Sequence, residues 1–261
     1  MANIESELME IHLVKGKKSG KEEIELVLAP TKNYMDVEFD GLTTCNILSY
    51  GVGHFQNDIT STILLSFLPL FLKEISPIDS ERPGYWVGFV VVVGQVVDSL
   101  MTPLIGFLSD RTHTSIGKRK PWHIFGSIFT LISFLMLLEP CFYCNSDTAK
   151  IANSTFFFCL YNVGWAASQV SHMSLVPSLS VSRIRRDKLN NLRNSFTFIS
   201  NFIGLLSIFL TFSIVENPFR QFFVVSLITG SFGVIATFIF WFGVPEPHLV
   251  NSYFKFYLCY V

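Results

Sequence analysis

The sequence predicts an all-α, polytopic membrane protein with six transmembrane helices. Half of the 261 residues are hydrophobic and only 15% are charged, whereas a soluble domain of this length needs a more polar surface. A bilayer core requires about 20 apolar residues per helix. Six segments satisfy this requirement, and they cover residues 47–72, 84–108, 121–140, 153–176, 194–215 and 220–243. The connections between them are too short to hold a soluble domain.

The two ends of the chain differ from this central region. Residues 1–46 are polar, carry charges of both signs and lack the apolar core of a signal peptide, so we expect a mostly disordered cytosolic tail. Residues 47–243 form the predicted six-helix bundle. Residues 244–261 are expected to begin a cytosolic linker or to be an aberrant tail.

Four of the six segments carry polar residues at helical spacing, three or four positions apart. In chain order these residues are His54, Asn57, Asp58 and Ser61; Gln95, Asp98 and Thr102; Asn162, Trp165, Gln169 and His172; and Arg193, Thr197, Asn201 and Gly204. Polar side chains at bilayer depth are costly and mark solute or ion paths. The pattern therefore predicts one hydrated cavity shared by four helices.

The ionisable residues of this cavity are the candidates for binding and coupling. Asp58 is expected in the substrate or proton path, although it could instead form a structural pair with Arg193. Asp98 is expected to couple transport to a cation, with a structural contact to the basic loop as the alternative. For His54 and His172 we favour satisfied interior histidines over proton carriers.

The connection between the second and third segments is short and basic. Asp110 and Arg111 end the second segment, and we expect them to form a conformational latch with the loop residues Gly117, Lys118 and Lys120. Lys and Arg are concentrated in this connection and in the one that contains residues 183–193. By the positive-inside rule both connections face the cytosol, which also places the N-terminus there.

Other chemistry finds little support in the sequence. The five cysteines are scattered apart from Cys141 and Cys144, for which we favour free thiols over a disulfide. No Cys or His cluster has metal-ligand spacing, no cofactor motif is present, and an enzyme is not expected. The net charge of −1 gives no reason to expect a nucleic-acid partner; the expected partners are membrane lipid and a small solute.

The stretch from Asp98 to Trp122 resembles the glycoside–pentoside–hexuronide:cation symporter branch of the major facilitator superfamily. That branch has an Asp, then Pro and Gly, then a loop that ends in Gly-Lys-x-Lys/Arg-Pro-Trp. The matching residues are Asp98, Pro103, Gly106, Asp110, Gly117, Lys118, Lys120, Pro121 and Trp122. The resemblance implies the N-terminal half of a twelve-helix fold, with substrate held between two six-helix halves. A missing C-terminal half or a second copy would complete it.

The resemblance also implies roles for individual residues. Asp58 and Arg193 occupy positions that contact substrate in sugar symporters of the branch, and we place His54, Gln169 and His172 beside them. At the cation site Asp98 is retained. Thr102 and Gln169 replace two acids there, so coupling to H+ is favoured over Na+.

Three functions stay open at this point. The strings at 50–58 and 164–177 resemble a lysosome- or melanosome-type member of the branch that is needed for cysteine import. This favours a cysteine transporter in a lysosome-related membrane, with the plasma membrane as the alternative location. A carbohydrate:cation symporter and a non-transporting truncated isoform that regulates a longer form are the alternative functions.

Overall fold

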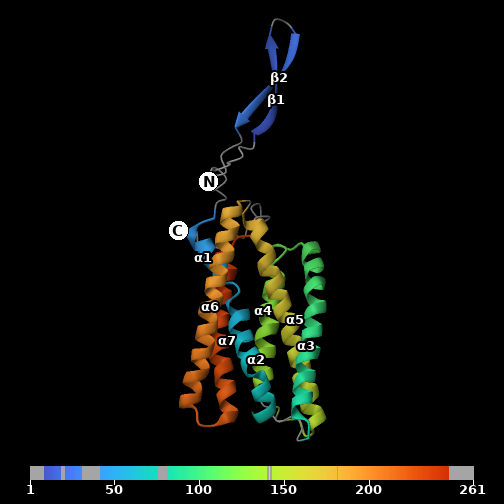
Figure 1. The fold of residues 1–261 in the computed structure, drawn as a ribbon, viewed down its shortest axis with the longest axis vertical. Coiled ribbons are helices and arrows are strands. Elements are labelled where there is room, and N and C mark those ends of the chain that lie inside the picture. The colour runs from blue at the N-terminus through green and yellow to red at the C-terminus, as the bar shows by residue number, and fades with distance from the viewer. Residues whose placement is uncertain are drawn as a thin grey trace, which may run out of the picture.

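The computed structural model describes residues 9–18, 21–30, 42–75, 81–139, 141, 143–180 and 182–246. Long helices run up and down beside one another and form a bundle (Figure 1). In chain order they are α1 (Thr44–Val52), α2 (Phe55–Leu70), the π-helical turn η2 (Phe71–Ile75), α3 (Pro83–Arg111), α4 (Lys120–Leu138), α5 (Asp147–Leu179), α6 (Arg183–Ile214) and α7 (Pro218–Gly243).

The expected helical membrane architecture is confirmed in its coarse form. Four helices are long and apolar enough to cross a membrane, namely α3, α4, α6 and, from Arg220, α7. The α1–α2 segment falls short because each of its two helices is short, and α5 falls short because polar residues recur along its 33 residues. Six crossings therefore stay a prediction.

The first apolar segment differs from the sequence prediction. A single helix was expected over 47–72, but the chain turns at Gly53 and His54 between α1 and α2. A capping box at Thr43 and Asn46 starts α1 three residues earlier than expected. The turn places Asp58 in the first turn of α2.

The N-terminal region also differs from the expectation of a mostly disordered tail. Strands β1 (Met9–Lys18) and β2 (Lys21–Pro30) pair antiparallel, with Met9 opposite Pro30 and Lys18 opposite Lys21. Charge and low hydrophobicity suggested disorder, but the Ile, Leu and Val residues among these charges favour strands. Residues 247–261 lie outside the described residues, and so does most of the expected linker or aberrant tail.

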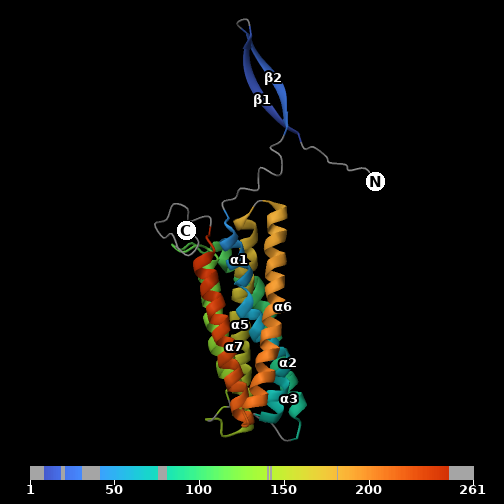
Figure 2. The same ribbon diagram turned by 90° about the vertical axis from the view of Figure 1, so that its left-hand side faces the viewer.

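Glycines bring α4 and α5 close together. A Cβ added at Gly164 would lie 2.5 Å from the backbone nitrogen of Thr130, and one added at Gly126 would collide with the backbone of Ser168. Small residues allow such close approach between membrane helices. Figure 2, turned by 90° from Figure 1, shows α1, α6 and α7 side by side. The outward faces of α3 and α6 leave apolar side chains such as Leu100 and Phe202 exposed.

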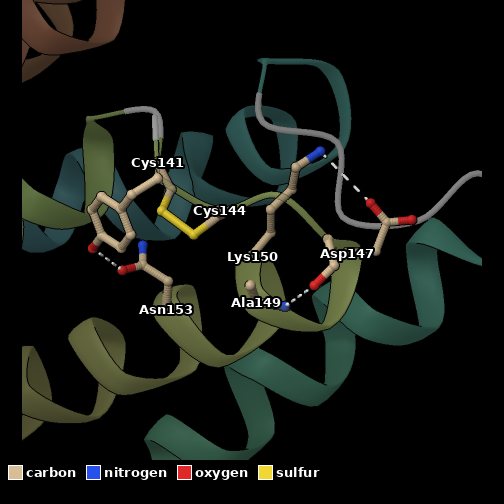
Figure 3. Close-up of a disulfide and its surroundings, with 8 residues drawn as sticks. Cys141, Cys144, Asp147, Ala149, Lys150 and Asn153 are labelled. Atoms are coloured by element: carbon tan, nitrogen blue, oxygen red, sulfur yellow. Dashed lines mark hydrogen bonds and ion pairs between the residues drawn. A yellow bond between two sulfur atoms is a disulfide. The ribbon is translucent and has the colours of Figure 1, made fainter.

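The α4–α5 connection contains a disulfide between Cys141 and Cys144, whereas free thiols were expected (Figure 3). A turn in which the Cys144 N–H donates to the Cys141 carbonyl (3.4 Å) brings their Cα atoms to 5.5 Å, within the usual range for a disulfide. Asn153, in the only glycosylation sequon, lies within α5, and its Oδ1 accepts a bond from the Tyr143 hydroxyl (2.6 Å).

Candidate functional site

Asp58 lies just after the break between α1 and α2. Its carboxylate accepts a hydrogen bond from the Thr197 hydroxyl of α6 (2.7 Å), and His54 Nε2 lies 3.5 Å from its other oxygen. The side chain is only 12% exposed. The first and fifth of the six predicted apolar segments therefore meet at Asp58.

Arg193 lies one turn before Thr197 on the same face of α6. Its guanidinium acts electrostatically on Asp58 and on the His54 and His172 rings. Within the described residues no ion pair joins it to Asp58, and its buried Nε has no hydrogen-bond partner. The structural pair considered as an alternative for Asp58 is therefore not formed among the described residues.

His172 and His54 flank the break. His172 is fully buried, stacks on the Tyr50 ring at a centroid distance of 4.3 Å, and donates from Nε2 to the Tyr50 carbonyl (2.9 Å). The His54 ring stacks on the His172 ring, with the two centroids 5.6 Å apart. His172 thus uses one nitrogen for a backbone carbonyl, whereas its Nδ1 and that of His54 have no hydrogen-bond partner among the described residues.

Sequence reasoning missed a third histidine, His123 of α4. Its Nε2 lies 3.1 Å from the Gly53 carbonyl, and Trp241 of α7 donates its indole N–H to Nδ1 (2.9 Å). A signal was present in the third apolar segment, because His123, Ser127 and Thr130 repeat at helical spacing and are all buried. The third apolar segment therefore also carries polar residues on one helical face, in addition to the four predicted segments.

A second polar group lies between α3 and α5. Asp98 Oδ1 is buried without a partner, and Thr102, one turn further, hydrogen-bonds the same carboxyl group. On α5, Gln169 Oε1 is also buried and unpartnered. Tyr161, bonded to Thr60 (3.1 Å), is within electrostatic range of both Asp98 and Asp58.

The expected latch is a structured turn between α3 and α4. Asp110 pairs with Arg119, which also donates to the Ser109 hydroxyl (3.0 Å), whereas Arg111 lies 3.8 Å above the Phe107 ring of its own helix. Arg119 thus takes a role in the turn that we had not assigned to it.

Glu246, three residues after α7, is the other member that we missed. Its carboxylate accepts hydrogen bonds from the backbone N–H groups of Lys118 (2.7 Å) and Arg119 (3.0 Å). Gly117, with a φ of +122°, brings the backbone against this carboxylate. The Lys120 ammonium donates to the Trp241 carbonyl (3.1 Å). The sequence around this loop gives no sign that Lys118 contacts an acid 128 positions further along the chain.

The bundle combines long apolar helices with ionisable residues gathered at a helix break inside it, an arrangement typical of polytopic membrane transport proteins. The chain belongs to the MFS/sugar transport protein family, whose model matches residues 49–250. It is similar to major facilitator superfamily domain-containing protein 12, with 36% identity to the Equus caballus protein and 35% to the Homo sapiens protein over 160 residues.

Other relatives extend the comparison to symporters. An uncharacterised symporter of Synechocystis is 31% identical over 184 residues, which is 67% of this chain and 32% of that protein. Sodium-dependent lysophosphatidylcholine symporter 1 of Xenopus tropicalis is 25% identical over 165 residues, 62% of this chain and 30% of that protein. The matches to the Equus caballus and Homo sapiens proteins cover 59% of this chain. They cover 33% and 32% of those proteins, so the chain spans about a third of the length of these relatives.

Proposed function

We propose that this chain is the N-terminal, six-helix half of a solute:cation symporter. Membership of a transporter family and similarity to two kinds of symporter support the activity. Coverage of about a third of each relative agrees with a chain that needs a second half. The apolar helices and the polar cavity residues support six crossings with a cytosolic N-terminus.

The substrate that we propose is a small zwitterion, and cysteine in particular. The observation that carries this proposal is a pair of opposite charges without an ion pair among the described residues: Asp58 accepts from Thr197 of α6, and Arg193 lies one turn before Thr197 on the same helix. An ammonium group would bind the Asp58 carboxylate, and a carboxylate would bind the Arg193 guanidinium, which presents a fork of donors. The His54 ring lies beside Asp58, and Gln169 supplies an unpartnered amide oxygen.

For coupling we propose H+ at Asp98. Thr102 and Gln169 leave Asp98 as the one carboxylate of its group, and a single carboxylate with two neutral oxygens is a weak site for Na+ but a sufficient one for a proton. The sodium dependence in the name of the lysophosphatidylcholine symporter belongs to that protein.

The membrane that we propose is that of a lysosome or a related organelle, with the plasma membrane as the alternative. A carbohydrate:cation symporter is the second candidate function, favoured by the sugar-transport description of the family. The third candidate is a non-transporting isoform that pairs with a longer form or with a second copy of itself.

Uptake by organelles tests the proposal. The longest reading frame that contains this chain is expressed in cells without related transporters, and uptake of labelled cysteine and of a disaccharide is measured with and without a protonophore. We expect cysteine uptake that collapses with the proton gradient and is lost in Asp58→Asn and Arg193→Gln. Asp147→Asn, at the exposed start of α5, is the matched control. Undiminished uptake by Asp58→Asn would exclude the assigned role of this acid.

A further inference from the structure

We infer that His123 is a positioning residue for the substrate site, and that it acts by holding the break between α1 and α2 in place with its tautomer set by Trp241. The effect of His123 on transport rests on the proposed function, whereas its role in holding the break does not depend on that function. The contacts of four helices carry the inference.

The break frees backbone carbonyls in the middle of a bundle. The N–H of Gly53 bonds back to the Tyr50 carbonyl (3.0 Å), and α2 begins only at Phe55. A carbonyl left without a donor in an apolar interior is costly, so it is expected to find a hydrogen-bond partner. His123 supplies the donor for the Gly53 carbonyl, and His172 adds a second donor to the Tyr50 carbonyl, which already accepts from the Gly53 N–H.

Trp241 determines which form of the His123 ring is present. An indole N–H can only donate, so the Nδ1 atom that receives it carries no proton. The neutral ring then has its one proton on Nε2, which is the nitrogen that faces the Gly53 carbonyl. A protonated ring would turn an N–H toward the Trp241 N–H. Trp241 therefore holds His123 as a neutral donor aimed at the break.

The surroundings leave the break little freedom. His123 is 1% exposed, and a Cβ added at Gly53 would lie 2.7 Å from His172 Nε2 and would collide with the Phe240 ring. His54, the next residue, faces Asp58. Any displacement of Gly53 would therefore shift the acid that we assign to the substrate.

Two variants separate the hydrogen bonds of His123 from its volume. His123→Leu removes the bonds to Gly53 and Trp241, and with them the 3.4 Å contact between Nδ1 and the Ser127 hydroxyl. His123→Gln keeps an amide N–H for Gly53 and an amide oxygen for Trp241. His113→Leu, on an exposed histidine of the α3–α4 connection, is the matched control. Backbone deuterium exchange is measured on detergent-solubilised protein for peptides that cover residues 50–58.

We expect exchange in this segment to rise about tenfold in His123→Leu, the effect of one lost buried hydrogen bond, and to stay at the wild-type rate in His123→Gln and His113→Leu. A well-folded His123→Leu protein with wild-type exchange would overturn the inference. If His123→Leu does not fold, Trp241→Phe combined with Ser127→Ala removes both groups that lie within hydrogen-bond distance of Nδ1, and this double variant is expected to raise exchange about threefold. Deuterium exchange at the wild-type rate in that variant would also overturn the inference.

Transport kinetics test the link to the substrate. In His123→Leu we expect the KM to rise about fivefold with kcat little changed, and His123→Gln to restore the wild-type KM. A fall in kcat with an unchanged KM would contradict a positioning role. If the wild-type protein takes up no solute while exchange still rises in His123→Leu, the proposed function fails and the role of His123 at the break stands.

Discussion

Gly117 combines two requirements that only glycine meets. Its φ of +122° is unfavourable for other residues, and an added Cβ would collide with the Glu246 carboxylate. We expect Gly117→Ala to destabilise the protein by about 1–2 kcal/mol, measured as a lower melting temperature in detergent. Gly88→Ala, within α3 with open space around its added Cβ, should be neutral or slightly stabilising. Equal melting temperatures for the two variants would show that the turn adapts.

Thr197 fixes the position of the Asp58 carboxylate through one short hydrogen bond. Bonds to charged groups contribute about 1.5–3 kcal/mol. We therefore expect Thr197→Val to raise the KM for the transported solute at least about tenfold, while Thr197→Ser, which keeps the hydroxyl, stays near wild type. Initial rates of labelled uptake over a range of solute concentrations give both values. A Val variant with the wild-type KM would separate Thr197 from substrate binding.

At the scale of elements, the α3–α4 connection is held from the end of α7. Loss of the Glu246 carboxylate leaves the N–H groups of Lys118 and Arg119 without acceptors. We expect Glu246→Ala to raise deuterium exchange in residues 117–120 more than tenfold, since bonds to a charged acceptor are the stronger kind. Glu216→Ala, in the exposed α6–α7 connection, should leave exchange in this loop unchanged.

The close packing of α4 against α5 depends on glycine at two positions, Gly126 and Gly164. We expect Gly164→Ala to lower the melting temperature clearly, because its Cβ would press on the backbone of Thr130. Gly106→Ala is the control, since its nearest neighbour, a Val170 methyl, lies at an ordinary 3.9 Å. Similar stability for both variants would mean that the two helices can move apart at little cost.

At the scale of the whole molecule, the α3–α4 connection and the start of α6 lie at one end of the bundle, and the α4–α5 connection lies at the other (Figure 1). The distribution of Lys and Arg predicts that the first end faces the cytosol. In a cysteine-free background, we expect an impermeant thiol reagent to label a cysteine at His113 only from the cytosolic side, and one at Tyr143 only from the other side. Labelling of both from one side would contradict the topology.

The sequence was sufficient for the helical architecture, and it drew attention to several ionisable residues whose roles stay predictions. Runs of apolar residues specify spans locally, and α3 begins and ends within three residues of the predicted segment. Asp58, Arg193 and Asp98 stood out because charge is rare at that depth. The break at Gly53 was hidden because apolar residues continue across it. Glu246 and His123 were missed because their partners lie 128 and 70 positions away, and no local pattern encodes such contacts.

Trp241 belongs to two networks at once. Its carbonyl accepts from the Lys120 ammonium near the α3–α4 turn, and its indole N–H donates to His123 beside the break. One residue of α7 therefore connects the membrane surface to the interior over the first turn of α4. If this half tilts as a rigid body during alternating access, the turn and the break are expected to move together. A displacement of the α3–α4 turn would then also displace Asp58, while each helix keeps its length.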